Sequence, residues 1–468
     1  MSLIISKIFG WHSILHDDEV LGEVPDNRSI YRNAFKIAWP SAMESVLIAL
    51  IGAVDTAMVG VLGKEAISAV GIVTQPKFII LAPILALNIG VTVLVARRKG
   101  SGNQAAANSY LHSALLVSFC AAVFLSVMGI VFARQFLLFA GAGNDYIDLA
   151  VSYFRIILIG NIFYSTGLTI TAAQRGIGNT KISMVTNLAA NIVNLIFNAL
   201  LINGLFFFPK LGVVGAAIAT MIGNIVSFVI AVASVLPKER YLSLRIEKVF
   251  KPIPQDFEDI WSITKNSLVE QVFLRIGFFI YAKAVASLGT TSYAAHMVCM
   301  NIMTISFGFG DGLQIANTSL VGQSMGKDRV DMAKIYTGVT KKIGIVIAIV
   351  LSVLITLCSD QLAGFFTTDL GVIKECEIPL IILSLTVLFQ IPQVIITGAL
   401  RGAGDVRFVA ILMLVSVTLV RPCLTYLLCY PLKLGLTGAW IALFTDQITR
   451  NLLSNWRFRQ GKWKTIRL

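Results

Sequence analysis

The sequence predicts an all-α polytopic membrane protein, with twelve transmembrane helices in two six-helix lobes. Of its 468 residues, 56% are hydrophobic and only 13% are charged, and the mean hydropathy is +0.80. A soluble domain carries about 25% charged residues, and a soluble core of this length could not bury the apolar excess, because its surface must face water. This composition argues against a lone soluble enzyme, a secreted disulfide scaffold and a disordered chain.

Long apolar stretches recur along both halves of the chain. A membrane-spanning helix needs about 20 mostly apolar residues. The first half predicts spans at 36–61, 70–95, 108–133, 149–172, 184–207 and 213–236. The second half predicts spans at 262–286, 293–321, 336–358, 377–399, 408–430 and 435–455.

One long polar connection separates the two sets of spans and divides the chain. We expect a cytoplasmic N-terminal segment at 1–33, an N-lobe with spans 1 to 6 at 34–236, a cytoplasmic linker at 237–260, a C-lobe with spans 7 to 12 at 261–456 and a basic cytoplasmic tail at 457–468.

The positions of Lys and Arg predict the orientation. With the N-terminus in the cytoplasm, most of the 38 Lys and Arg residues lie on the cytoplasmic side, as the positive-inside rule requires. Few lie outside: Lys64, Arg134, Lys210, Lys374 and Lys433. We therefore expect a multi-pass protein of the plasma (inner) membrane with both termini in the cytoplasm. The net charge of +13 is then a topology signal, and we expect no nucleic-acid partner.

The two halves repeat each other at an offset of 226 residues. Ser41 and Glu44 match Ser267 and Glu270, and an Arg-Gly-x-Gly turn recurs at 175–178 and 401–404. Near the end the offset shifts to 223. Each repeat holds an even number of spans, so the lobes enter the membrane in the same direction and are related by a pseudo-two-fold axis along the membrane normal. This architecture favours transport, with a substrate cavity between the lobes and alternating access by rocking.

The order of short motifs resembles one transporter family. The stretch AVDTAMVG at 53–60 is similar to the first-span signature of the multidrug and toxic compound extrusion (MATE) family, and the paired Arg-Gly-x-Gly turns, Ala294-Ala295-His296 and Gly461-Lys462-Trp463 also resemble it. The resemblance covers essentially the whole chain. It implies an antiporter that exports organic cations or drugs in exchange for H⁺ or Na⁺.

Acidic residues inside the spans need a reason, because a charge in hydrocarbon costs about 2.5–3.5 kcal/mol on insertion scales. The embedded acids are Asp55, Glu44, Glu270, Asp311 and Asp446. Glu44 and Asp55 are three helical turns apart and share a face of the first span. A functional role is favoured for Asp55, and for Glu44 function and structure are balanced; the structural alternative is an ion pair with Lys77 or Arg155.

Four amides line one stripe of the fifth span, at spacings of 4, 3 and 4 residues: Asn187, Asn191, Asn194 and Asn198. Such a stripe can hold helices together, or it can present carbonyl oxygens to a small cation or to a protonated carboxyl group. We place Asn187 and Asn191 among the candidates for the substrate cavity or its gate.

By family resemblance, the ion-coupling site combines Asp55, Asn194, Asn198 and Thr220, with Na⁺ held at the first three if Na⁺ is the coupling ion. The family usually has an acid where this chain has Asn198. That departure weakens the expected Na⁺ affinity and leaves Asp55 as the main titratable group.

The C-lobe departs further from the family. Some relatives carry acids where this chain has Leu274 and Gln390, and Glu270 lies one turn before Leu274 and could substitute. An inner gate or a contact between lobes is the alternative for Glu270 and its counterpart Glu44.

Asp311 and Gln314 share a face of the eighth span and are candidates for a cavity that takes a cationic substrate. The alternative is neutralisation of Asp311 by Lys283, Arg275 or Arg421.

The predicted function is therefore a secondary transporter, not an enzyme, that needs no cofactor besides its coupling ion. Its partners are small, amphipathic, cationic substrates and the lipid bilayer, and nothing demands more than a monomer. The turns at 175–178 and 401–404 lack the Gly-Lys-Ser/Thr ending of a nucleotide-binding loop, which argues against ATP-driven pumping. The alternative is a flippase for a lipid-linked saccharide or other lipid in the same superfamily.

Overall fold

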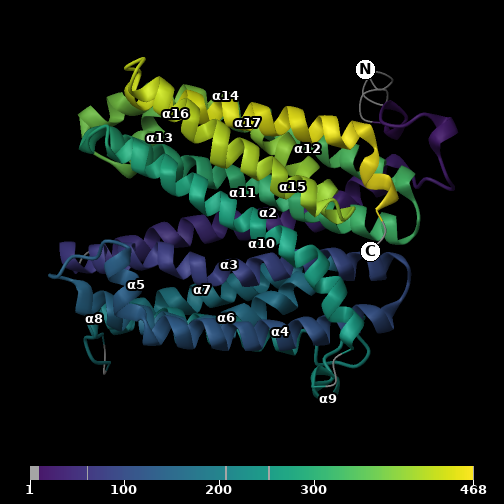
Figure 1. The fold of residues 1–468 in the computed structure, drawn as a ribbon, viewed down its shortest axis with the longest axis horizontal. Coiled ribbons are helices and arrows are strands. Elements are labelled where there is room, and N and C mark those ends of the chain that lie inside the picture. The colour runs from purple at the N-terminus through teal and green to yellow at the C-terminus, as the bar shows by residue number, and fades with distance from the viewer. Residues whose placement is uncertain (1–9, 61, 206–207, 251–252, 467–468) are drawn as a thin grey trace. The chain divides into compact units, whose positions relative to one another are not determined.

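The computed structural model describes residues 10–60, 62–205, 208–250 and 253–466, and within these ranges its regular structure is helical (Figure 1). The first repeat contains α2 (Asn27–Gly60), α3 (Lys64–Gly100), α4 (Gln104–Val131), α5 (Ala133–Phe139), α6 (Ile147–Gly176), α7 (Thr180–Asn203) and α8 (Gly212–Ala233). The short α9 (Ile246–Val249) follows. The second repeat contains α10 (Pro254–Ala286), α11 (Thr290–Gly326), α12 (Val330–Leu357), α13 (Ser359–Phe366), α14 (Leu370–Gly402), α15 (Val406–Met413), the π-helix η3 (Leu414–Val420), α16 (Arg421–Cys429) and α17 (Gly435–Gln460). Three 3₁₀ turns lie near the ends: η1 (Trp11–Ser13), η2 (Asp17–Glu19) and η4 (Lys462–Thr465).

Internal packing divides the chain into two compact units, and each division falls inside a long helix. The N-unit is Leu47–Leu268, and the C-unit comprises Met1–Val46 and Val269–Leu468. The first part of α2 therefore packs with helices of the second repeat, and the first part of α10 packs with helices of the first. The lobes expected from the repeat, 34–236 and 261–456, stay a prediction.

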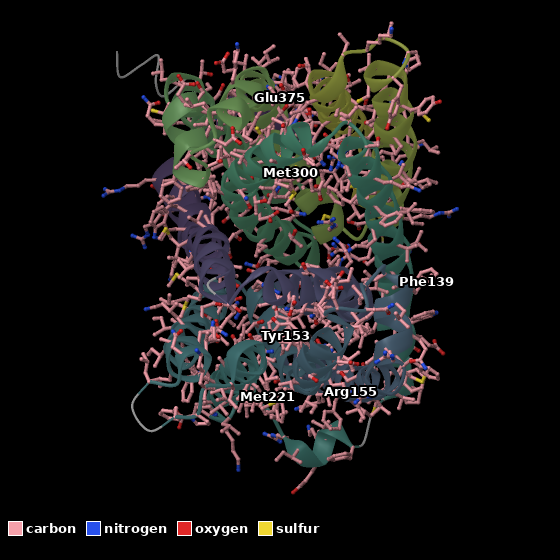
Figure 2. All side chains as sticks on the ribbon, turned by 90° about the vertical axis from the view of Figure 1, so that its left-hand side faces the viewer. Phe139, Tyr153, Arg155, Met221, Met300 and Glu375 are labelled. Atoms are coloured by element: carbon pink, nitrogen blue, oxygen red, sulfur yellow. The ribbon has the colours of Figure 1, made fainter. Side chains whose placement is uncertain are left out.

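Small residues allow helices of the N-unit to approach closely. Helix α6 packs against α3, α4 and α8, and α7 lies along α8 (Figure 1). A Cβ on Gly215 of α8 would lie 2.6 Å from the carbonyl oxygen of Leu201 on α7, so that position needs glycine. Large apolar side chains of this unit differ widely in exposure. Tyr153 on α6 is 8% exposed, whereas Phe139 at the end of α5 is 94% exposed (Figure 2).

The C-unit is built around α14, which packs against α11, α12 and α17. Gly398 and Gly402 bring α14 against α11, because a Cβ on either would lie within 2.6 Å of a backbone oxygen, that of Gln314 or Thr318. The first part of α2 packs on α11 as well, where a side chain on Gly312 would meet the backbone of Ala42. The N-terminal segment before α2 also belongs to this unit, with Ile14 packed against Gly338 of α12.

The sequence repeat reappears as repeated backbone conformation. Gly63 and Gly289, which precede α3 and α11, have φ of 106° and 114°. Gly178 and Gly404, in the two Arg-Gly-x-Gly turns, have φ of 85° and 92°. These angles are disfavoured for residues with a Cβ, so glycine recurs because both repeats make the same turns.

Eight described helices are long and apolar enough to cross a membrane: α3 (from Ser68), α4, α6, α7, α8, α12, α14 and the continuous stretch Val406–Cys429. The other four predicted spans lie in the long helices α2, α10, α11 and α17. The helices extend beyond the predicted spans. Helix α2 begins at Asn27 because its first turns are packed, with Ile30 fully buried, and α10 begins at Pro254 inside the predicted linker.

Candidate functional site

A polar cavity of about 370 Å³ lies inside the N-unit. Apolar side chains of α2, α3 and α6 form part of its wall, including Ile48, Ile51 and Leu81. The polar lining comes from α3, α6, α7 and α8: Lys77, Asn161, Tyr164, Asn187, Asn191, Asn194, Thr220, Asn224 and Ser227. The volume suits a small ligand, and amide and hydroxyl groups predominate in its polar lining.

Hydrogen bonds join three of the predicted ion-coupling residues. Asn194 Nδ2 donates to Thr220 Oγ1 at 3.1 Å, and Asn198 Nδ2 donates to Asn194 Oδ1 at 3.2 Å. Thr220 Oγ1 in turn donates to the carbonyl oxygen of Ala216 at 3.0 Å. Asn198 is fully buried and is not among the residues that line the cavity, so these hydrogen bonds lead from the cavity wall into the protein interior.

Close packing of α7 and α8 sets this geometry. A Cβ on Gly223 would lie 2.8 Å from the carbonyl oxygen of Ala190. The spacing of the asparagines keeps them on the face of α7 that turns toward α8 and the cavity. Asn187 also lines the cavity, and its Nδ2 donates to the carbonyl oxygen of Ser183 at 3.2 Å.

Asp55 stands on the N-unit part of α2, but its side chain lies outside the described residues. The structure therefore brings Asn194, Asn198 and Thr220 together, and places Asn187 and Asn191 on the same cavity. The sequence reasoning did not single out Asn161, Tyr164 or Asn224. Asn224 follows Thr220 by four residues, a spacing that signals a shared helix face.

A second polar group lies in the C-unit, where Glu270 of α10 is fully buried and forms an ion pair with Arg401 of α14. In the amide orientation that satisfies its neighbours, Gln314 of α11 donates to Asp311 Oδ1 at 3.2 Å and accepts from Arg401. Glu270, Arg401, Gln314 and Asp311 thus form one network on three helices.

The two arginines that the repeat relates have different partners. Glu44 is buried on α2, and both Glu44 and Glu270 belong to the C-unit. Arg175, the counterpart of Arg401, instead donates to Ser183 Oγ at 3.3 Å in the N-unit. The repeat therefore conserves backbone turns more closely than side-chain partners.

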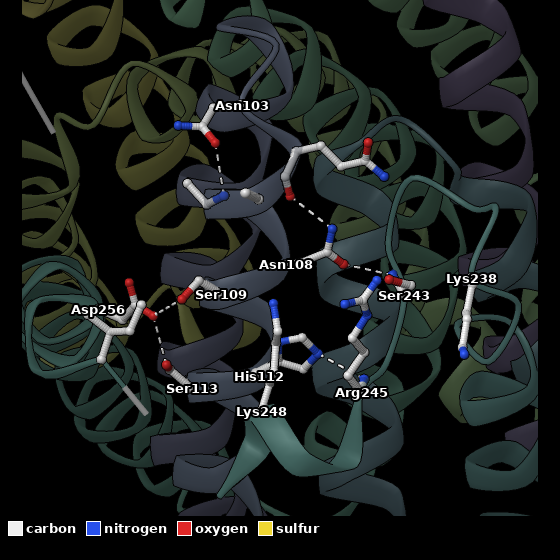
Figure 3. Close-up of a pocket in the computed structure, with 14 residues that line it drawn as sticks. Asn103, Asn108, Ser109, His112, Ser113, Lys238, Ser243, Arg245, Lys248 and Asp256 are labelled. Carbon is white, nitrogen blue, oxygen red and sulfur yellow. Dashed lines mark hydrogen bonds between the residues drawn. The ribbon is translucent and has the colours of Figure 1, made fainter. Parts of the chain in front are cut away.

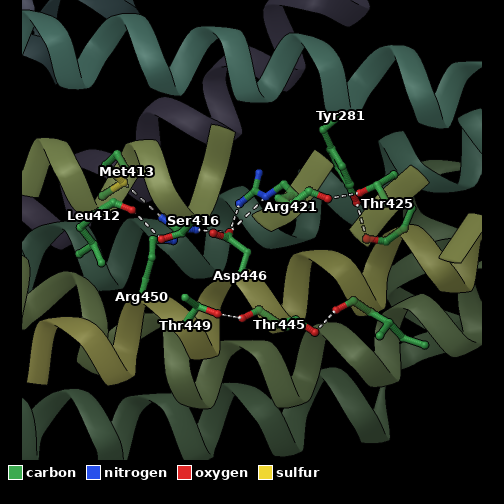
Figure 4. A network of polar contacts seen from close by, with 12 residues as sticks. Tyr281, Leu412, Met413, Ser416, Arg421, Thr425, Thr445, Asp446, Thr449 and Arg450 are labelled. Carbon is green, nitrogen blue, oxygen red and sulfur yellow. Dashed lines mark hydrogen bonds and ion pairs between the residues drawn. The ribbon is translucent and has the colours of Figure 1, made fainter. Parts of the chain in front are cut away.

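Asp446 is the centre of a buried ion cluster in the C-unit (Figure 4). Its Oδ2 accepts from Arg421 Nη2 at 2.5 Å and from Arg450 Nη2 at 2.7 Å. Arg421 also lies over the rings of Phe278 and Tyr281. Of the partners considered for Asp311, Arg421 thus pairs with Asp446 instead, and Arg401 reaches Asp311 through Gln314.

Gln390, a position where the family resemblance leads us to expect an acid, lies in the interior of the C-unit. Gln390 on α14 is 1% exposed, and neither its oxygen nor its nitrogen has a hydrogen-bond partner among the described residues. In the part of the chain that the structure describes, no three His, Cys, Asp or Glu side chains gather into a group that could hold a metal ion. Amide oxygens of Asn and Gln, which are not among these four residue types, can also bind a cation.

A family model described as MatE matches the chain twice, over residues 40–200 and 267–427. The chain belongs to the MatE family. The two matched segments coincide with the two sequence repeats, and the predicted resemblance is confirmed.

Relatives of this MatE chain match nearly its whole length. "Probable multidrug resistance protein NorM" of Thermotoga maritima is 28% identical over 444 residues, which cover 94% of each chain. "Multidrug resistance protein NorM" of Vibrio cholerae serotype O1 is 24% identical over 379 residues, covering 80% of this chain and 82% of the relative.

Solved structures of MATE transporters share the fold. One described as the outward-facing conformation of a multidrug resistance MATE family transporter has a TM-score of 0.87 at 21% identity, over 93% of this chain and 97% of the other. A MOP superfamily transporter from Pyrococcus furiosus has a TM-score of 0.86, with the same identity and coverage. The predicted all-α fold class, with twelve transmembrane helices in two lobes, is confirmed.

Proposed function

We propose that this MatE protein is a secondary active antiporter that exports organic cations or drugs in exchange for H⁺ or Na⁺ by alternating access. Its relatives carry the names of multidrug resistance proteins. The observation that carries the proposal is the N-unit cavity, where the bonded pair Asn194 and Thr220 lies at the wall. The family resemblance assigns these residues, with Asp55, to ion coupling.

In this mechanism Asp55 takes up the coupling ion in the outward-open state. Neutralisation of the carboxylate lets the helices of the first lobe repack, which lowers the affinity for a cationic substrate. The lobes then close and reopen inward, where the ion leaves and a new substrate loads. Competition between ion and substrate for one negative charge couples the two fluxes, because each stabilises a different state.

The composition of the cavity favours H⁺ over Na⁺ as the coupling ion. By the family resemblance, Asn198 supplies an amide where a second acid is usual, so the site has one carboxylate fewer. A bound Na⁺ needs several oxygen ligands and is weakened by the loss of a carboxylate, whereas a proton needs only the carboxylate of Asp55.

The proposal also covers the assembly, location and orientation of the protein. The protein acts as a monomer in the plasma (inner) membrane, with cytoplasmic termini, and carries out no covalent chemistry. Amphipathic cations are its substrates.

Efflux of ethidium, a fluorescent organic cation, from cells that express the protein tests the proposal. We expect efflux that is lost in Asp55→Asn at normal expression, is abolished when the proton gradient is collapsed, and persists without Na⁺. Asp145→Asn makes the same change at an exposed site of the N-unit and should leave efflux intact.

Three outcomes would count against parts of this proposal. Normal efflux by Asp55→Asn would remove Asp55 as the coupling residue and direct attention to Glu44 and Glu270. Dependence on Na⁺ with a collapsed proton gradient would reverse the assignment of the ion. The absence of ion-dependent efflux of ethidium and other cations by the unmutated protein would favour the lipid flippase.

A further inference from the structure

A second cavity of the N-unit lies away from the amide stripe, at the end of α4 where the predicted linker crosses it (Figure 3). Its volume is about 980 Å³. The first turns of α4 form one wall, and residues between Lys238 and Asp256 form the other. Helix α4 is one of the membrane-spanning candidates and begins at Gln104, so the cavity lies at one end of a candidate span. None of the proposed transport residues lines it.

The charges of this cavity are strongly unbalanced. Lys238, Arg245 and Lys248 line it, against the single carboxylate of Asp256. That carboxylate is already engaged, because its Oδ2 accepts from Ser109 Oγ at 2.5 Å and from Ser113 Oγ at 2.9 Å. Within the described ranges, none of the three cations forms an ion pair. The cavity therefore favours an anion.

Hydrogen bonds from α4 fix the linker in place, so the cationic wall is held in position. Asn108 Oδ1 accepts from the backbone N–H of Ser243 at 2.7 Å, and its Nδ2 donates to the carbonyl oxygen of Tyr241 at 3.0 Å. His112 Nε2 accepts from the backbone N–H of Arg245 at 3.0 Å. Figure 3 shows Arg245 and Lys248 beside His112. A preorganised site loses less entropy when a ligand binds.

The second repeat has its own basic cavity at the corresponding end of α12. Its volume is about 540 Å³, and four cations line it: Lys334, Lys341, Arg459 and Lys464. The segment that precedes α2 covers α12, with Glu19 paired to Lys334 at 2.7 Å and the backbone N–H of Leu21 donating to Asp331 Oδ2 at 3.1 Å. Partial burial and the neighbouring Lys334 ammonium lower the pKa of Lys464, a sign of crowded positive charge.

The two cavities follow the same construction. In the N-unit, the linker that leads into α10 lies across α4. In the C-unit, the segment that leads into α2 lies across α12. In both units, basic residues line the space between the segment and the helix. Positions 104–113 of α4 correspond to 330–339 of α12 at the repeat offset of 226. Recurrence in both units argues that these cavities are part of the architecture.

We propose that the N-unit cavity binds the phosphate headgroup of an anionic phospholipid from the adjacent leaflet. A phosphodiester carries one negative charge and several acceptor oxygens, which match the three cations that line the cavity. Basic pockets on spanning helices at the cytoplasmic side are suited to anionic headgroups. A bound lipid neutralises the repulsion among the three cations and ties the linker to α4.

Titration of the full-length protein in detergent with short-chain phosphatidylglycerol, followed by native mass spectrometry, tests the assignment. Short-chain phosphatidylcholine and inorganic phosphate serve as parallel ligands. We expect phosphatidylglycerol to bind selectively. The combined variant Lys238→Gln, Arg245→Gln and Lys248→Gln should lose one bound lipid, with affinity at that site reduced on the order of 100-fold, because each cation near an anionic lipid contributes about fivefold.

A matched variant controls for the removal of charge. Lys181→Gln, Lys327→Gln and Arg407→Gln neutralise the same residue types at exposed positions outside both cavities and should leave binding unchanged. The single change Lys248→Gln should weaken binding about fivefold and keeps the test decisive if the triple variant does not fold. Equal loss in the pocket and control variants would overturn the proposal. Binding of inorganic phosphate as tight as that of phosphatidylglycerol would also overturn it, by assigning the site to a soluble phosphate.

Discussion

Asn198 is the residue of the proposed ion site at which the family resemblance leads us to expect an acid instead of an amide. It is fully buried and donates to Asn194 Oδ1. If the ion site combines Asp55 with position 198, as the family resemblance predicts, Asn198→Asp gives it a second carboxylate. We expect this variant to make efflux depend on Na⁺, because paired carboxylates favour a hard cation. Ethidium efflux at a series of Na⁺ concentrations measures the change.

A control for this substitution lies in the same cavity. Asn224→Asp adds an equal charge to the same cavity from α8. Na⁺ dependence in Asn198→Asp alone would locate the ion at the predicted site. Equal Na⁺ dependence in both variants would show that the charge of the cavity matters and the position of Asn198 does not.

Single residues were predictable where their partners are local. The spacing of the asparagines on α7 is visible in the sequence, and Asn194 and Asn198 do bond to each other. The partner of Glu270 was not predictable, because Arg401 lies 131 positions away on α14. Gln314 links Asp311 to that arginine only when three helices are packed, so no pattern along one helix reveals it.

At the scale of elements, the turns that end the helices carry a conformational requirement. Gly178 and Gly404 have positive φ in the two Arg-Gly-x-Gly turns. We expect Gly178→Ala or Gly404→Ala to destabilise the protein by about 1–2 kcal/mol, since a Cβ in this conformation meets the backbone. Thermal unfolding in detergent would detect the lower melting temperature.

Gly364 supplies the comparison for these turns. It lies inside α13, and a Cβ there would meet nothing within 4 Å. Gly364→Ala should therefore leave stability unchanged or raise it slightly, because alanine is the better helix former. If all three alanine variants unfold at the temperature of the unmutated protein, the positive φ of the turns has no energetic consequence.

Helices were predictable from hydropathy, but their internal irregularities were not. The eleventh predicted span is a helix over Val406–Cys429, yet its middle is the π-helix η3. Gly277 of α10 explains why this region depends on tertiary packing: a Cβ there would lie 2.4 Å from the carbonyl oxygen of Val417 in η3. An apolar run of residues contains no signal for such a contact.

For the whole molecule, the repeat predicted two matching halves, and the family match to 40–200 and 267–427 follows it. The division into compact units was not predictable in the same way. It falls between Val46 and Leu47 and between Leu268 and Val269, inside α2 and α10, because packing groups part of each helix with the other repeat. The sequence repeat marks which segments are related by descent, whereas the compact units mark which segments contact each other. The boundaries of the repeats and of the units therefore differ.

The orientation of the whole chain follows from the distribution of Lys and Arg and can be measured directly. In a variant without the six native cysteines, a single cysteine replaces either Lys327 or Lys374, both exposed side chains. The loop after α11 is rich in basic residues, so the positive-inside rule places Lys327 in the cytoplasm and Lys374 outside. A membrane-impermeant thiol reagent should therefore label Lys374→Cys in intact cells and Lys327→Cys only after permeabilisation. The reverse pattern would invert the topology and, with it, the side from which Asp55 takes up its ion.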